Sequence, residues 1–194
     1  MDRTHGTGDG WVGERIRLRG VEPEDWEGFR DLARDTDDAR AAGPVDPPRS
    51  AAGFRAWTTE RALRPPGGDT FRLVVETLDD QDFAGSVTVA HTDTRAGRFM
   101  TGIEIARGHR RKGYATEAVC LVLAHMFTEQ RCHKCEVEVY AFNDASLALH
   151  RALGFSEEAR LRRHEFIAGT YHDVVLLGIT AAEFQAARPR PEPR

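Results

Sequence analysis

The chain has 194 residues, of which 40% are hydrophobic and 30% charged, and its formal net charge is −4. This length and composition predict one domain with a sizeable core, and the negative net charge disfavours a nucleic-acid partner. No stretch approaches the roughly 18 apolar residues of a membrane span, and the first residues lack the apolar segment of a signal peptide. We therefore expect a cytoplasmic protein without a membrane partner.

The three cysteines are few and odd in number, as is typical of a reducing compartment. Cys132 and Cys135, in the segment CHKC, have the spacing of half a zinc site, but no second pair of ligands appears at a similar spacing. The segment also runs into a strand-like stretch, whereas a redox CxxC motif opens a helix. We expect ordinary loop and strand residues here, with no metal.

The first part of the chain contains one predicted strand and two predicted helices. Residues 1–13 are rich in Gly and Asp and predict a flexible N-terminus. Residues 15–21 alternate as a strand does, and residues 23–35 begin with the proline and acidic residues of a helical first turn. The segment AGPVDPP at 42–48 interrupts the helical pattern. A helical pattern resumes at 50–63 behind a serine cap.

The remaining elements alternate between strand and helix patterns. Strand-like runs occupy 70–78, 82–92, 98–106, 134–142, 155–166 and 170–180, and helical patterns occupy 114–131 and 143–153. This order predicts an α/β domain over residues 14–183 with a mixed sheet and no internal repeat. The Pro-rich residues 184–194 predict a flexible tail.

A cationic loop, RGHRRKG, lies between the strand that ends at Ala106 and the helix that begins near Tyr114. This arrangement brings free backbone N–H groups and the positive end of a helix to one point, and Gly113 lets an anion approach the main chain. The spacing fits neither the nucleotide P-loop nor the dinucleotide motif GxGxxG. The pattern favours a cradle for a phosphate group; a solvated basic loop that caps a helix is the alternative.

Two segments resemble motifs of the GNAT superfamily of acyl-CoA N-acyltransferases. RRKGYA at 110–115 resembles the diphosphate loop R/Q-x-x-G-x-G/A, and NDASLALHRALGF at 143–155 is similar to N-x-x-S/A-x-x-x-Y-x-x-x-G-F. The closing residues, 155–180, resemble the branch that contains ribosomal-protein alanine and spermidine acetyltransferases. The resemblance covers roughly residues 14–180.

The resemblance implies a mostly antiparallel, mixed sheet of about seven strands flanked by about four helices, with the parallel strands 99–106 and 135–142 splayed apart. It also implies acetyl-CoA as the acyl donor, with the pantetheine arm along the first of these strands and the diphosphate on the following amides. The residues assigned to the cofactor are Ile103, Ile105, Ala106, Arg110, Arg111, Lys112, Gly113, Tyr114, Ala115, Thr116, Asn143 and Ser146. For Asn143 and Ser146, helix capping is the alternative role.

An amine that attacks a thioester must first lose a proton, because its pKa is about 8 to 10.4. The candidate bases are Glu138 and Glu104, each a charged residue within an apolar strand that faces either a cleft or solvent. Some family members carry their base at the position of Glu138. For the acid, His150 stands where the family has tyrosine and titrates near neutrality; Tyr140 and Tyr114 are further candidates.

The resemblance therefore implies an N-acetyltransferase that moves the acetyl group of acetyl-CoA to a primary amine by direct attack in a ternary complex. The acceptor is a small-molecule amine or a peptide N-terminus. A non-catalytic acyl-CoA-binding sensor is the alternative. The acidic stretch 31–48 has the charge to attract a cationic acceptor, or else it is a solvated loop. A homodimer is expected by resemblance only.

Overall fold

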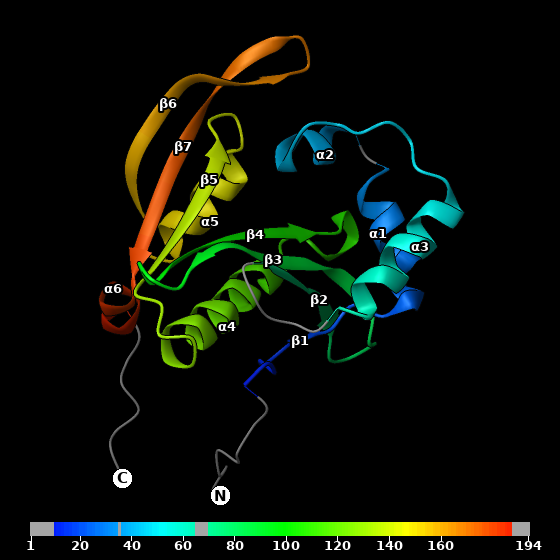
Figure 1. Ribbon diagram of the computed structural model, residues 1–194, viewed down its shortest axis with the longest axis horizontal. Helices are drawn as coiled ribbons and strands as arrows, with labels where there is room; N and C mark the ends of the chain where they lie inside the picture. The colour runs from blue at the N-terminus through cyan, green and yellow to red at the C-terminus, as the bar shows by residue number, and fades with distance from the viewer. Residues whose placement is uncertain (1–9, 35, 65–69, 188–194) are drawn as a thin grey trace, which may run out of the picture.

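The computed structural model describes residues 10–34, 36–64 and 70–187. Its seven strands form one sheet of order β1-β2-β3-β4-β5-β7-β6, antiparallel except between β4 and β5 (Figure 1). The strands are β1 (Ile16–Arg19), β2 (Phe71–Thr77), β3 (Phe83–Asp93), β4 (Arg98–Ile105), β5 (Lys134–Tyr140), β6 (Ser156–Ile167) and β7 (Thr170–Thr180). The helices are α1 (Trp26–Leu32), α2 (Thr36–Ala42), α3 (Ala51–Ala62), α4 (Tyr114–Thr128), α5 (Asp144–Ala152) and α6 (Ala181–Ala186).

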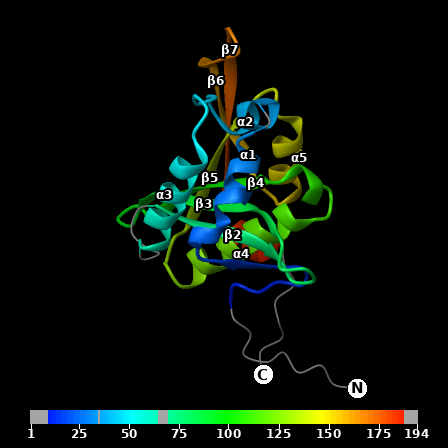
Figure 2. The ribbon, with the colours of Figure 1, turned by 90° about the vertical axis from the view of Figure 1, so that its right-hand side faces the viewer.

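Helices cover both faces of the sheet, and the alternation of β2 shows how the strands serve both layers (Figure 2). Leu73 and Val75 belong to the larger core cluster with α4, whereas Val74 between them packs with Phe29 of α1. Successive side chains of a strand point to opposite faces, so an unbroken apolar run is expected in a strand covered on both sides.

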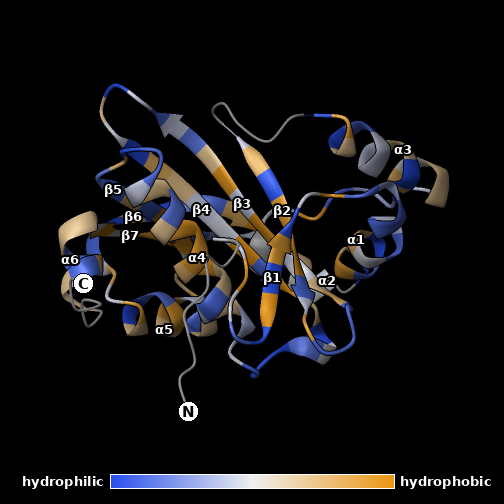
Figure 3. Ribbon diagram, turned by 90° about the horizontal axis from the view of Figure 1, so that it is seen from below, coloured by the Kyte–Doolittle hydropathy of each residue, from blue (hydrophilic) through white to orange (hydrophobic). Residues whose placement is uncertain are grey.

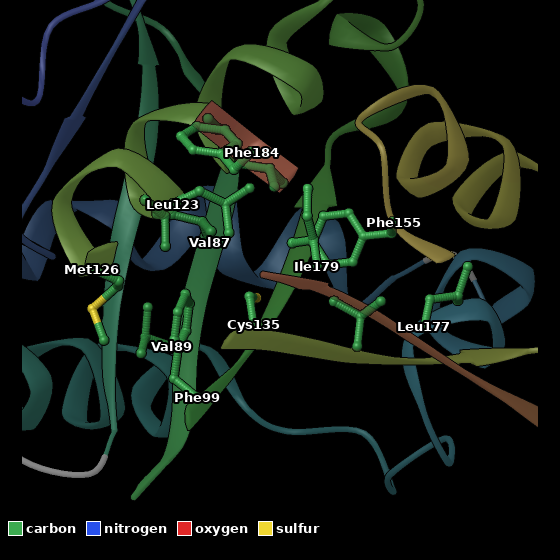
Figure 4. Packing of buried hydrophobic residues seen from close by; sticks show 14 of the residues in the cluster. Val87, Val89, Phe99, Leu123, Met126, Cys135, Phe155, Leu177, Ile179 and Phe184 are labelled. Atoms are coloured by element: carbon green, nitrogen blue, oxygen red, sulfur yellow. The ribbon is translucent and has the colours of Figure 1, made fainter. Parts of the chain in front are cut away.

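The larger core lies between α4 and the central strands. Apolar residues are frequent on α4 (Figure 3), and the close view shows Leu123 and Met126 of α4 near Val87, Val89 and Phe99 of the sheet (Figure 4). All five side chains are buried. No helix among the described residues is long and apolar enough to cross a membrane.

The predicted fold class is confirmed, with two helices more than the expected four among the described residues. The additional helix α6 begins with a capping box, in which Thr180 Oγ1 accepts from the Glu183 N–H at 3.3 Å and the Glu183 carboxylate accepts from the Thr180 N–H at 2.8 Å. This T-x-x-E signal was present in the sequence. The additional helix α2 lies in the acidic stretch TDDARAA, which has no apolar period.

Packed structure also extends past both predicted limits of the domain, 14 and 183. The Trp11 ring packs against the His125 ring of α4, with ring centres 4.4 Å apart and the planes tilted by 38°, and Val12 forms a bridge with Arg17. Phe184, in the predicted tail, is buried. Residues 1–9 and 188–194 lie outside the described residues.

The parallel strands β4 and β5 pair only over their first three residues. The paired positions are Arg98 with Lys134, Phe99 with Cys135, and Met100 with Glu136. Beyond them β4 stays paired with β3 as far as Ile105, and β5 stays paired with β7 as far as Tyr140. The two strands therefore diverge at mid-length, as the resemblance implies (Figure 1).

Candidate active site

The cationic loop joins the end of β4 to the start of α4, as predicted. Arg111 has φ +63° and Gly113 has φ +83°, so two left-handed residues turn the chain into the helix. The first N–H groups of an α-helix have no acceptor within the helix and lie at its positive end. The amides from Tyr114 onward can therefore hold an anion.

The side chains of this loop are less well placed than its main chain to bind an anion. Arg110 turns back and donates from Nε to the Ile105 carbonyl at 2.9 Å, and Lys112 Nζ lies 6.0 Å from the centre of the Tyr114 ring. The Arg110 bond ties the loop to the end of β4. The backbone amides are thus the better-placed donors for a diphosphate.

The space beside Gly113 is occupied by a residue that sequence reasoning missed. A Cβ at Gly113 would lie 2.9 Å from both Nη1 and Nη2 of Arg15. A side chain at Gly113 would therefore meet the Arg15 guanidinium on that side of the residue. Arg15 and Lys112 are in contact although 97 residues separate them, so no local sequence signal could have found the pair.

The two candidate glutamates project from the same face of the sheet, on either side of the divergence. On β5, Glu138 alternates with Val137 and Val139, which are buried in the α4 core, so it points to the opposite face. On β4, Glu104 aligns across β3 with Ser86 and then with Val74 of β2, which packs against α1. This face therefore carries both carboxylates.

The surroundings of the two carboxylates differ. Arg72 Nη1 lies 3.7 Å from Oε2 of Glu104 and donates to Ser86 Oγ at 3.1 Å. Burial lowers the pKa of Arg72, and the Glu104 carboxylate opposes that shift. Glu138 is exposed and has no ion pair with any residue that the structure describes. Glu104 thus has a cationic partner that an arriving ammonium group would have to share.

Glu138 lines a cavity of about 160 Å³ where β5, α5, α2 and the β6–β7 hairpin meet. Its lining residues are Ala41, Glu138, Val139, Tyr140, Asn143, Ser146, Glu165 and Val174. Burial raises the pKa of Tyr140, and the carboxylates of Glu165 and Glu138 raise it further, so this phenol keeps its proton at neutral pH. Glu165 was not predicted, because only the folding of the hairpin brings it beside β5.

Asn143 holds two elements together at this cavity. Its Oδ1 accepts from the Ser146 N–H at 3.0 Å, which caps α5, and its Nδ2 donates to the Ala41 carbonyl of α2 at 3.1 Å. Both ends of the amide are therefore engaged in capping and in docking α2. This geometry favours the capping role for Asn143, while Ser146 also lines the cavity.

The predicted acceptor-side acidic stretch is described only in part. Asp35 lies outside the described residues, as do the side chains of Asp37 and Asp38. Asp31 is paired with Arg34 at 3.3 Å. The described carboxylates of this stretch are thus the paired Asp31 and the exposed Asp46.

His150 lies in the core and is not among the residues that line the cavity. Its Nδ1 is 2.9 Å from the Ser146 carbonyl, which can only accept, so the proton is on Nδ1. Its Nε2 is buried without a partner among the described residues, and its ring packs edge-on to Phe155 at 5.1 Å. Burial lowers the pKa of His150. The ring is therefore neutral at pH 7, with no proton on Nε2 to give to a thiolate.

The buried His150 predicts a pH-dependent difference in stability. Burial holds the pKa of His150 below the ordinary value of 6.5. As the pH falls below that value, the unfolded chain binds more protons than the folded chain, so the free energy of unfolding decreases. His150→Phe removes this term. We expect the free energy of unfolding of the variant, relative to wild type, to rise between about pH 7.5 and pH 5.5 in denaturant titrations. A difference that does not change with pH would contradict the neutral, buried histidine.

The cysteines of the CHKC segment are core residues. Cys132 and Cys135 are buried and unbridged, and burial raises the pKa of both thiols. A raised pKa disfavours the reactive thiolate. Among the described residues there is no group of three or more His, Cys, Asp or Glu that could hold a metal ion.

A sheet whose central parallel strands diverge beside a free helix N-terminus is the arrangement that the resemblance to acyl-CoA-dependent acyltransferases implies. The acetyltransferase (GNAT) domain family matches residues 15–156. The SPbeta prophage-derived uncharacterized N-acetyltransferase YokL of Bacillus subtilis (strain 168) is 34% identical over 175 residues, which cover 90% of this chain and 95% of that protein. The chain therefore belongs to the GNAT acetyltransferase family. It is an acetyltransferase, and the acetyltransferases of this family take the acetyl group from acetyl-CoA.

Two further proteins are similar to this chain over most of their length. The putative ribosomal N-acetyltransferase YdaF of the same Bacillus strain is 24% identical over 181 residues, covering 91% of this chain and 97% of that protein. The crystal structure of spermidine N-acetyltransferase from Vibrio cholerae in complex with CoA and spermine has a TM-score of 0.76 at 24% identity, covering 88% and 98% of the two chains. It shows the same fold.

Proposed function

We propose that this acetyltransferase moves the acetyl group to a primary amine by direct attack in a ternary complex, with Glu138 as the base. The observation that carries the proposal is the divergence of β4 and β5, which separates an anion-binding loop at one end from the Glu138 cavity beside β5. Acyl donor and amine can thus approach the same gap from different elements.

The donor is proposed to lie along the second half of β4. Beyond Met100, β4 has no pairing on its β5 side, so the main chain at Ile103 and Ile105 offers its edge to the pantetheine amides. The Ala106 N–H instead donates to the Ala84 carbonyl of β3 at 2.9 Å, so Ala106 is proposed to line the donor site without this donor. The diphosphate lies on the amides at the start of α4. The residues of that proposed site are Arg110, Arg111, Lys112, Gly113, Tyr114, Ala115 and Thr116, with Ser146 at the reacting end. Asn143 is proposed to support that end by capping α5.

The acceptor is proposed to enter as an ammonium ion at the cavity. Glu138 and Glu165 both line it, and two carboxylates attract a cation. Glu138 takes the proton directly or through water, after which the neutral amine attacks the thioester carbonyl. An amide on the edge of a diverging strand stabilises the oxyanion. Glu104, already beside Arg72, is proposed to attract the acceptor without accepting its proton.

The departing thiolate is proposed to take its proton from Tyr140. This phenol lines the same cavity as Glu138, and burial raises its pKa, so it retains a proton to give. Tyr140→Phe is expected to lower kcat about tenfold or more and to leave the Kd of acetyl-CoA unchanged, as judged by steady-state kinetics and calorimetry. An unchanged kcat would mean that the thiolate is protonated by water.

A panel of amines incubated with acetyl-CoA and analysed by mass spectrometry tests the proposed function. The panel should contain polyamines, amine-bearing metabolites and peptides with free N-termini. A mass increase of one acetyl group on a panel member, dependent on the protein, supports the proposal. Binding of acetyl-CoA with no acetylated product from any member would favour the sensor alternative.

A homodimer is proposed from the family resemblance alone. Its mass in solution can be measured by light scattering. A monomer at the concentrations used in the assays would contradict it, without affecting the proposed chemistry.

A further inference from the structure

A short turn before β1 is fastened to the first turn of α4 by Glu117. Its Oε1 accepts from the backbone N–H of Arg15 at 2.9 Å and of Ile16 at 3.4 Å. The turn is closed by the Gly13 N–H, which donates to the Ile16 carbonyl at 2.9 Å. A Cβ at Gly13 would lie only 1.9 Å from Glu117 Oε1, so glycine permits this close approach.

The side chain of Arg15 continues from this turn to the anion-binding loop. Its Nε donates to Glu117 Oε2 at 3.2 Å, and its Nη1 donates to the Lys112 carbonyl at 3.0 Å. The guanidinium therefore bridges a carboxylate of α4 and the peptide group that precedes Gly113. About half of the Arg15 side chain is exposed, whereas that of Glu117 is 13% exposed.

We propose that Arg15 is a positioning residue for the diphosphate of CoA, acting through the loop main chain and through Glu117. The bond to the Lys112 carbonyl fixes the peptide from which Gly113 turns into the helix, so the following amides keep one direction. This inference rests on the proposed placement of the diphosphate at the start of α4.

The charge of Glu117 gives Arg15 a second role. A carboxylate in the first turn of a helix is favoured by the helix dipole, but it repels a diphosphate bound at the same end. Arg15 cancels that charge while Glu117 holds the turn. Removing the arginine alone should therefore leave a partly buried carboxylate facing the incoming phosphates, which is worse for binding than removing both charges.

Calorimetric titration with CoA tests this role independently of turnover. Arg15→Ala is expected to raise the Kd of CoA about tenfold, the loss of one charge-assisted bond. Arg15→Lys should have a smaller effect, because lysine keeps the positive charge but lacks the planar guanidinium that donates to two acceptors at once. The double variant Arg15→Ala/Glu117→Gln should bind CoA more tightly than Arg15→Ala. Arg160→Ala is the matched control: Arg160 is similarly exposed, lies near two carboxylates on β6 and β7, and should leave the Kd unchanged.

Steady-state kinetics with S-acetylpantetheine, which lacks the diphosphate, separate this inference from the proposed function. Arg15→Ala should raise the KM for acetyl-CoA and leave kcat/KM for S-acetylpantetheine unchanged. An equal decrease in kcat/KM with both donors, or an unchanged Kd of CoA in folded Arg15→Ala, would overturn the inference. A wild-type protein that uses both donors equally well would instead contradict the placement of the diphosphate itself.

Discussion

Replacing Glu138 by glutamine is expected to lower kcat by roughly 10²–10⁴-fold while the Kd of acetyl-CoA stays near that of wild type. Glutamine keeps the shape and hydrogen bonding of the side chain but cannot accept the proton of the amine. The loss should shrink as pH rises, because the acceptor then arrives already deprotonated. Steady-state kcat values between about pH 7 and pH 10, together with calorimetry, measure both effects.

Glu104→Gln is the matched control for this prediction. Glu104 lies on the same face but within 3.7 Å of Arg72, so its loss should act mainly on the KM for the amine. A pH-rescued defect in kcat for Glu104→Gln, with none for Glu138→Gln, would reverse the assignment. If neither variant shows such a defect, a water chain carries the proton and both glutamates have only binding or structural roles.

Gly113→Val is expected to weaken CoA binding at least tenfold, or about 1.4 kcal/mol, and to lower the melting temperature. Gly113 has φ +83°, which a β-branched residue adopts only with strain. The new Cβ would also lie 2.9 Å from the guanidinium nitrogens of Arg15 and displace it from the Lys112 carbonyl. Both effects distort the amides that hold the diphosphate, and calorimetry with CoA measures the result.

Gly108→Val provides a control in the same loop. A Cβ at Gly108 meets no atom within 4 Å, and its φ is not in the left-handed region. Its CoA affinity should therefore match that of wild type. If folded Gly113→Val bound CoA as tightly as Gly108→Val does, the diphosphate would not rest on this main chain.

Much of the fold was predictable because the local sequence patterns mark the same strands and helices that the structure contains. The strands alternate or form apolar runs, and Ser50 and Asn143 cap their helices, as the structure shows. The divergence of β4 and β5 could be predicted only through the resemblance, since both strands have ordinary patterns. The helix α2 could not be predicted from apolar periodicity, because its sequence has none.

The sequence predicted those site residues that stand out within their own strand, but not the partners that reach the site from other segments. Period-two alternation singled out Glu104 and Glu138, but it gave no information on the Arg72 partner of Glu104. Glu165 and Arg15 reach the site from distant segments, so only the folded chain shows them there.

The position of His150 in the motif is not enough to establish a catalytic role for it. The motif places a titratable ring where relatives have a phenol, but in the structure the Nδ1–H of this ring donates to the Ser146 carbonyl. A histidine four residues after another helical residue can turn back to that residue's carbonyl. Spacing alone does not reveal whether it does.

Initial velocities with acetyl-CoA and the best amine of the panel, both varied, test the central claim most directly. Direct attack in a ternary complex predicts double-reciprocal lines that intersect, because both substrates must be bound before either product leaves. Parallel lines would mean that the acetyl group first rests on the protein. That result would contradict direct transfer across the gap between β4 and β5.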